Sequence, residues 1–191
     1  MSKEDKKKKI LDTAAKLFAE KGFENTTTRD ICKATGMSHA MIYYYFKDKE
    51  SVLNEILEDI LSDGLKQIKE IAQSPKSPKE KLAAITHMYA RYHVVKIDRM
   101  KVFVHDQKSL KPGHKKKVNA YQREYLDILE DLLKRLRDED AIVDVDTKAA
   151  AFTFFGMVHW AYRWYEPKGK IKPDQLSEII NRIFTKGLYK H

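Results

Sequence analysis

The sequence has few of the residues that break or cross-link a chain. Its 191 residues include seven glycines, five prolines and a single cysteine, Cys32. One cysteine excludes a disulfide within the chain and a cysteine-based zinc site, as is typical of proteins of the reducing cytoplasm. Glycine and proline are scarce, which favours long helices. Together with the single cysteine, this leads us to expect an all-α, cytoplasmic protein. The spacing of the apolar residues, described below, predicts about nine helices.

Several classes of protein are excluded by what the sequence lacks. No apolar run reaches the roughly 18 residues that a membrane-spanning helix needs, and none follows the lysine-rich start, Met1–Lys9, which we expect to be a frayed arm. There is no nucleotide-binding glycine loop, no His-Glu-x-x-His sequence and no serine elbow. The histidines are scattered, with His87 and His93 on different faces of one predicted helix. We therefore expect neither an enzyme nor a membrane protein, and no metal or cofactor.

Basic residues exceed acidic ones. The chain has 37 lysines and arginines against 28 aspartates and glutamates, a formal net charge of +9. This balance suits a polyanionic partner, but it fits DNA, RNA and an anionic membrane surface equally well. The motifs, rather than the charge, must choose between these partners.

The stretch 26–50, TTTRDICKATGMSHAMIYYYFKDKE, contains two short helical patterns separated by a glycine. Thr27 is a favourable N-cap, and an acidic residue three positions later completes a weak capping box. We expect a helix over residues 28–34 that packs Ile31 and Ala34 on one face.

Gly36 ends that helix, because glycine adopts a positive φ without a steric cost and lets the chain turn within a few residues. Ser38 then caps a second helix over residues 39–46, which buries Ile42 and Phe46 one turn apart. The two helices and their turn predict a helix-turn-helix. The outer face of the second helix carries His39, Ala40, Tyr43, Tyr44 and Lys47.

Three consecutive tyrosines, Tyr43–Tyr45, place a cluster of aromatic rings on a short helix. Exposing such a cluster to water is unfavourable, so it indicates a binding surface. Arg29, Lys47 and Lys49 flank them, as phosphate-binding side chains do. A solvated surface on a small helical bundle is the alternative, and we favour DNA binding.

The same residues resemble a family signature. The sequences TTRDI at 27–31, ATGMS at 34–38 and IYYYFKDKESVL at 42–53 are similar to the N-terminal DNA-binding domain of TetR-type bacterial transcriptional repressors. The resemblance covers about the first fifty residues and departs at Ala40 and Met41, where many members have glycine and a hydroxyl residue. The resemblance implies base contacts from Arg29, His39, Ala40 and Tyr44. The full set expected to bind DNA is Thr28, Arg29, Ser38, His39, Ala40, Tyr43, Tyr44, Tyr45, Lys47 and Lys49.

Beyond this stretch the apolar residues continue to recur at helical spacing. A long helix over 49–73 is expected to lead into the body of the protein, and Pro75 and Pro78 follow its end. Other helices are expected near 7–21, from 78 to about 92, over 99–108, after a loop at 111–113, from about 147 to 160, and over 174–189. We expect a DNA-binding domain, residues 1–50, and a ligand-binding and dimerisation domain, residues 51–191.

The last expected helix has a wider apolar face than one neighbour covers. Together with the small residues Ala149, Ala150 and Gly156, it predicts a dimer interface to which each chain contributes two helices, with ordinary core packing as the alternative. One helix-turn-helix reads too few base pairs to find a genomic site, whereas a two-fold dimer presents two recognition helices about 34–36 Å apart. We therefore expect a homodimer on an inverted-repeat operator.

The resemblance also implies that the body binds a small apolar effector that releases the repressor from DNA. Candidate ligand-binding residues are Tyr89, Tyr92, His93, Phe103, Tyr121, Tyr125, Phe152, Phe155, Trp160 and Trp164, with a plain core as the alternative for each. The stretch 101–117 carries six lysines against Asp106 alone, which suits a phosphorylated head group or, alternatively, a solvated surface. The run WAYRWY at 160–165 is loosely similar to the fatty acyl-coenzyme A-responsive branch of the family, so an acyl-coenzyme A is the candidate effector.

An architectural protein that binds DNA irrespective of sequence is the remaining alternative. It uses the same lysines and predicts equal affinity for any duplex. Binding to the chain's own upstream DNA, compared with scrambled DNA at physiological salt, separates the two functions.

Overall fold

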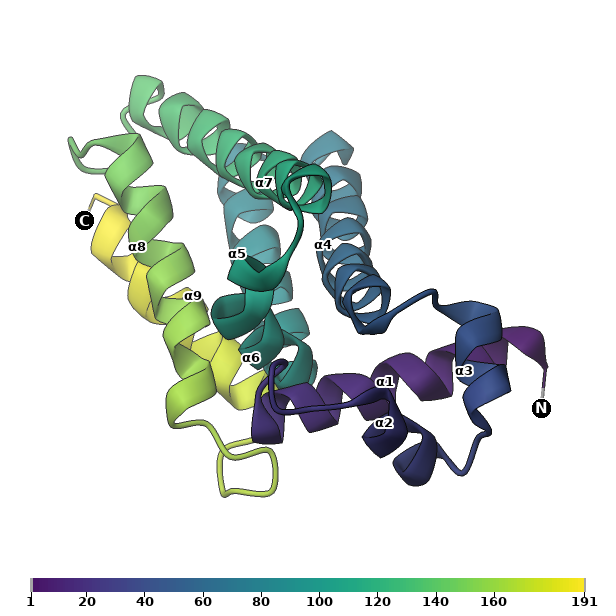
Figure 1. Cartoon of the computed structure of the whole chain (residues 1–191). Helices are drawn as coiled ribbons and strands as arrows, with labels where there is room; N and C mark the ends of the chain where they lie inside the picture. The colour runs from purple at the N-terminus through teal and green to yellow at the C-terminus, as the bar shows by residue number, and fades with distance from the viewer. Residues whose placement is uncertain (1, 191) are drawn as a thin grey trace. The chain divides into compact units, whose positions relative to one another are not determined.

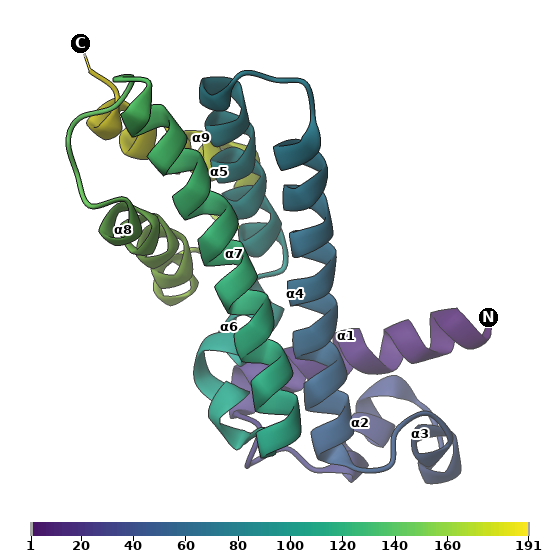
Figure 2. The same ribbon diagram turned by 90° about the horizontal axis from the view of Figure 1, so that it is seen from above.

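The protein is all-helical over residues 2–190, which the computed structural model describes, apart from one isolated bridge between Ile142 and Tyr189. The nine α-helices of this range (Figures 1 and 2) are α1 (Lys3–Lys21), α2 (Thr28–Thr35), α3 (His39–Tyr45), α4 (Lys49–Gln73), α5 (Pro78–Val95), α6 (Ile97–Asp106), α7 (Pro112–Asp138), α8 (Thr147–Trp160) and α9 (Pro173–Leu188). The prediction of an all-α fold is therefore confirmed. None of these helices is both long enough and apolar enough to cross a membrane.

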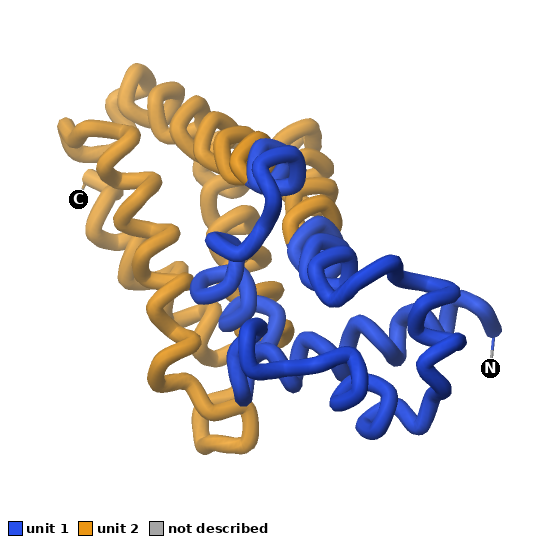
Figure 3. The backbone as a smooth tube through the Cα atoms, viewed as in Figure 1, with its two compact units in different colours: residues 1–60, 98–118 blue, residues 61–97, 119–191 orange. Residues whose placement is uncertain are grey.

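The chain divides into two compact units, coloured separately in Figure 3. The first unit contains the residues up to Ile60 and the segment Asp98–Val118, and the second contains Leu61–Ile97 and the residues from Asn119 onward. The chain passes from one unit to the other within α4, at the start of α6 and within α7. The functional boundary that the sequence predicts at residue 50 stays a prediction.

The basic start of the chain is helical, so the prediction of a frayed arm over its described residues is wrong. The Ser2 hydroxyl accepts the Asp5 backbone N–H at 3.0 Å, and the Asp5 carboxylate accepts the Ser2 backbone N–H at 2.8 Å. These two bonds satisfy N–H groups that the start of a helix otherwise leaves free. α1 therefore begins at Lys3, earlier than its apolar pattern predicts, and ends at Gly22, whose φ is 83°.

α2, the following turn and α3 form the predicted helix-turn-helix. Thr27 caps α2 through a reciprocal capping box, and Gly36 ends it in the left-handed region at φ 70°. The prediction that Ala34 packs beside Ile31 is wrong, because Ala34 is exposed. Thr35 is buried instead, and its hydroxyl donates a hydrogen bond to the Ile31 carbonyl at 2.7 Å, which satisfies the polar group.

The boundaries of α6 and α7 also differ from the sequence-based expectation. α6 begins at Ile97, and a short 3-10 helix, Gln107–Ser109, follows it. The loop predicted at 111–113 is wrong in part, because α7 begins at Pro112. Proline is tolerated in the first turn of a helix, since its missing N–H would have no partner there.

In the second unit α5 packs along α9 and against α8. Leu82 and Ile85 of α5 are buried, as are Ile180 and Phe184 of α9. Removing these apolar side chains from water stabilises the unit, at roughly 1.5–3 kcal/mol for each large side chain that is fully buried.

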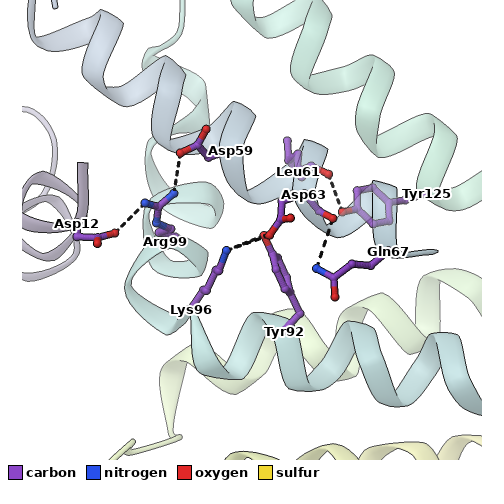
Figure 4. A network of polar contacts seen from close by, with 9 residues as sticks. All are labelled: Asp12, Asp59, Leu61, Asp63, Gln67, Tyr92, Lys96, Arg99 and Tyr125. Atoms are coloured by element: carbon purple, nitrogen blue, oxygen red, sulfur yellow. Dashed lines mark hydrogen bonds and ion pairs between the residues drawn. The ribbon is translucent and has the colours of Figure 1, made fainter. Parts of the chain in front are cut away.

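Gly64 of α4 lets two tyrosines reach that helix. A Cβ built at Gly64 would collide with the Tyr125 hydroxyl and come within 3.2 Å of the Tyr92 ring. The Tyr125 hydroxyl donates to the Leu61 carbonyl at 2.8 Å, and the Tyr92 hydroxyl donates to the Asp63 carboxylate at 2.8 Å (Figure 4). The missing side chain thus lets α5 and α7 join α4 within the second unit.

Candidate nucleic-acid interface and effector region

α3 buries one face and exposes the other. Ile42 and Phe46, four residues apart, are 1% and 4% exposed, whereas Tyr43 and Tyr44 are 51% and 65% exposed. The Ser38 hydroxyl caps the helix by accepting the backbone N–H of the third helical residue at 3.2 Å. A buried anchor and a cap therefore hold the tyrosine-bearing face in the solvent, which is the arrangement that a recognition helix requires.

The predicted DNA-binding residues all belong to the first unit. The exposed ones are Arg29, Ser38, His39, Ala40, Tyr43, Tyr44 and Lys47, and the half-buried ones are Thr28, Tyr45 and Lys49. Within the part of the chain that the structure describes, Arg29 and Lys47 form no ion pair, so their charges are available to a ligand. The individual contacts of these residues with DNA stay predictions.

Two of the predicted DNA-binding residues also have partners inside the protein. The Lys49 ammonium donates to the Phe23 carbonyl at 2.7 Å and to the Glu24 carbonyl at 3.3 Å, and it lies 4.2 Å from the centre of the Phe23 ring. The Tyr45 hydroxyl donates to the Lys3 carbonyl at 3.1 Å. Lys49 therefore fastens the loop between α1 and α2 to α4, and Tyr45 fastens α3 to α1.

Arg99 connects α6 to α1 and α4 within the first unit (Figure 4). Its guanidinium donates to the Asp12 carboxylate of α1 at 2.8 Å and to the Asp59 carboxylate of α4 at 3.3 Å. The Arg99 side chain is 11% exposed, whereas the Asp12 and Asp59 side chains are 53% and 44% exposed. A guanidinium with so little exposure to water would destabilise the fold if no anion compensated its charge. No local pattern in the sequence indicates this contact, because its three residues lie far apart in the chain.

The lysine-rich stretch 101–117 is partly paired within the first unit. The Lys111 ammonium lies 2.7 Å from the Glu50 carboxylate, and the Lys117 ammonium lies 2.5 Å from the Glu58 carboxylate. The lysines of this stretch without an ion pair among the described residues are Lys101, Lys108, Lys115 and Lys116. Part of the positive charge therefore attaches this stretch to α4, and part faces the solvent.

A cluster of aromatic and imidazole side chains lies in the second unit, and we call it the Tyr89 cluster. The centre of the Tyr89 ring lies 4.0 Å from that of His93, 5.4 Å from that of Tyr125 and 5.2 Å from that of Phe155. The Tyr89 hydroxyl forms a 2.8 Å hydrogen bond with Nε2 of His159. Burial lowers the pKa of His93 to about 3 and that of His159 to about 4, so both rings are neutral at neutral pH. The Tyr89 cluster is therefore an apolar, uncharged region with few hydrogen-bonding atoms.

The predicted ligand-binding residues do not all meet at this cluster. Those that are buried or half-buried in the second unit are Tyr89, Tyr92, His93, Tyr121, Tyr125 and Phe155. Phe103 is buried in the first unit, and Phe152, Trp160 and Trp164 are exposed. The prediction omitted His159, although its position four residues after Phe155 places both on one face of α8.

An apolar stripe remains exposed on α8 and α9. Phe152, Gly156 and Trp160 recur every four residues along α8 and are exposed, and Ile179 and Ile183 of α9 are 45% and 60% exposed. A Cβ built at Gly156 has no neighbour within 4 Å, so another helix has room to approach. Apolar surface of this kind marks a protein interaction site. This α8–α9 stripe lies where the sequence predicts a dimer interface.

The comparisons with known proteins agree with this arrangement. Residues 10–56 match the family described as bacterial regulatory proteins, tetR family, and residues 75–188 match the tetracyclin repressor-like, C-terminal domain. The chain is 32% identical over 195 residues to the HTH-type transcriptional repressor KstR2 of Rhodococcus jostii (strain RHA1), covering 97% of this chain and 92% of that protein.

Two solved structures show the same similarity over nearly the whole chain. The TetR family transcriptional regulator PfmR from Thermus thermophilus superposes with a TM-score of 0.86 at 29% identity, covering 95% of this chain and 99% of that one. AibR in complex with isovaleryl coenzyme A and operator DNA superposes with a TM-score of 0.79 at 26% identity, covering 93% and 97%. The chain belongs to the TetR family of bacterial DNA-binding transcriptional regulators.

Proposed function

We propose that the protein is a repressor that binds an inverted-repeat operator as a homodimer and leaves it when an acyl-coenzyme A binds the second unit. Residues 1–50 read the DNA, and the rest of the chain binds the effector and the partner copy. The single observation that carries the proposal is the exposed face of α3, held out by buried Ile42 and Phe46 in a chain of the TetR family.

The α8–α9 stripe supports the homodimer. Ile183 alone is 60% exposed, and Phe152 and Trp160 add two large apolar side chains to the stripe. A two-fold axis is the commonest symmetry of soluble oligomers. An axis that passes through the α8–α9 stripe buries the same surface on both copies. The pair then presents two copies of α3, as an inverted repeat requires.

The Tyr89 cluster supports an effector with an apolar acyl group. Its rings are neutral and aromatic, and its hydroxyl and imidazole groups provide the few polar atoms that orient a ligand. AibR, which is 26% identical to this chain, has been solved with isovaleryl coenzyme A and operator DNA. A thioester of this class is therefore the effector that we propose.

A binding experiment tests the DNA part of the proposal. A labelled duplex from upstream of the protein's own coding sequence is compared with a scrambled duplex of the same length and composition at physiological salt. We expect at least about a 1,000-fold preference for the upstream duplex. Arg29→Ala is expected to reduce this preference, because it removes an expected base contact. Equal affinity for both duplexes would refute the proposal and favour the architectural protein, which the net charge of +9 also suits.

The effector part is tested on the same complex. Isovaleryl coenzyme A and longer acyl-coenzyme A thioesters are titrated into the bound operator, with free coenzyme A and the matching free fatty acid as controls. We expect release by one class of thioester and by neither control. If no thioester releases the DNA or raises the melting temperature of the protein, the effector assignment is wrong, whereas the DNA-binding assignment is unaffected.

A further inference from the structure

The first turn of α1 is attached to the recognition helix. The Tyr45 hydroxyl donates to the Lys3 carbonyl at 3.1 Å, and the Lys3 ammonium lies 5.1 Å from the centre of the Tyr44 ring. The Tyr44 and Tyr45 rings meet edge to face, with their centres 5.0 Å apart. Figure 1 shows α3 beside the N-terminal end of α1. The basic start of the chain therefore has a defined place next to α3.

An open groove separates these two helices. Lys3 and Lys6 line it from α1, and Ala40 and Tyr44, one turn apart on the outer face of α3, line it from the other side. Lys3 is exposed and Lys6 is half-buried, and among the residues that the structure describes neither forms an ion pair. Lys7, by contrast, is paired with an acidic residue of α4 at 2.6 Å. The groove thus has two uncompensated cations on one wall.

We propose that this groove binds the phosphate backbone of the operator, with Lys3 and Lys6 as phosphate contacts. The inference rests on the proposed function, because it needs the outer face of α3 to lie in the major groove. Ala40 and Tyr44 then read bases, and the strand that passes beside them meets the two ammonium groups. Contacts of this kind set the register of the protein on the duplex without reading its sequence.

Two features hold Lys3 in place for this contact. The reciprocal bonds between Ser2 and Asp5 start α1 at Lys3, and they keep the pKa of the Asp5 carboxyl below its ordinary value, so it stays ionised as the cap requires. The Tyr45 hydroxyl fixes the Lys3 carbonyl. Tyr45 is therefore a positioning residue for Lys3 in addition to any contact of its own.

A pair of charge-matched double variants tests the inference. Lys3→Gln with Lys6→Gln removes the two cations of the groove, and Lys8→Gln with Lys9→Gln removes two exposed cations of the same helix that do not line it. Affinity for the operator duplex is measured over a range of salt concentrations. The slope of log K against log salt is negative, and each lost phosphate contact makes it shallower by about 0.9, so four lost contacts per dimer make it shallower by about 3.6. We expect this loss for the groove variant and a change below about 1 for the control.

Other outcomes overturn the inference. Equal losses in both double variants mean a general effect of net charge, and no loss in the groove variant means that the groove is empty in the complex. Arg29→Ala separates the inference from the proposed function: if it loses operator preference while the groove variant binds normally, only the inference fails. If Arg29→Ala also binds the operator with its normal preference, the base contact expected of Arg29 is wrong as well. Tyr45→Phe, which keeps the ring, is expected to make the slope shallower by less than the groove variant does, and an unchanged slope would remove its positioning role.

Discussion

Arg99 is shielded from water whereas its two carboxylate partners are exposed, and this contrast predicts which side of the contact costs more stability when it is removed. Arg99→Met removes the guanidinium and keeps an apolar stem in a space that is 11% exposed. The double variant Asp12→Asn with Asp59→Asn removes the same two ion pairs from the other side. If the contact were an ordinary surface pair, the two changes would cost the same.

The exposed fractions predict unequal costs. The Asp12 and Asp59 side chains are already 53% and 44% exposed beside Arg99, so they stay hydrated after Arg99→Met, and we expect a loss of about 1–2 kcal/mol in the free energy of unfolding. After the double asparagine change a shielded guanidinium has no anion, and the loss rises to about 3 kcal/mol or more. For a chain of this length the melting temperature falls by about 2–4 °C for each kcal/mol.

Thermal unfolding followed by circular dichroism at one fixed protomer concentration measures these losses, because dimerisation makes the melting temperature depend on concentration. Lys16→Met is the control: it breaks an exposed pair with Glu20 at 4.0 Å, and we expect a change below about 0.5 kcal/mol. A double asparagine variant that is no less stable than Arg99→Met would show that the guanidinium is solvated and would refute the reasoning.

Three further predictions concern the second unit. Ile183→Asp places a charge on the α8–α9 stripe and is expected to give a monomer by light scattering; a dimer of unchanged affinity would contradict the interface. The pKa values of His93 and His159, about 3 and 4, lie below the ordinary 6.5, so their contribution to stability is complete above pH 6.5 and is lost as pH falls through 4, by up to about 1.4 kcal/mol per pH unit for each ring. Chemical unfolding at several pH values measures this slope, and stability that does not fall between pH 6.5 and 4 would contradict their burial. Gly64→Ala pushes a methyl group against the Tyr125 hydroxyl and is expected to destabilise the protein by about 1–3 kcal/mol in the same unfolding assay, whereas a gain would show that the tyrosine moves freely.

The sequence predicts the helix-turn-helix well because its signals are local. Thr27 caps α2 and Ser38 caps α3 within three residues of the groups that they bind, and Gly36 needs only its own φ. The one error in this stretch, Ala34 in place of Thr35, arose because apolar periodicity does not recognise a threonine whose hydroxyl is satisfied by its own helix.

The effector region was harder to predict because burial there depends on distant neighbours. Phe152 and Phe155 are equally apolar in the sequence, yet Phe152 is exposed and Phe155 lies against Tyr89 of another helix. The same limit applies to Arg99, whose two anions lie 87 and 40 positions away in the sequence. Local patterns identify a helix, but they do not identify its neighbours.

The bonds of Lys49 affect how genetic data on this regulator should be interpreted. Its ammonium holds two carbonyls of the loop that precedes α2. A screen for clones that no longer silence a reporter will therefore collect substitutions at Lys49 whose defect is a loosened loop or a smaller amount of protein in the cell. Immunoblots of such clones, compared with clones altered at Lys47, which has no ion pair in the described part of the chain, would distinguish lost protein from lost recognition.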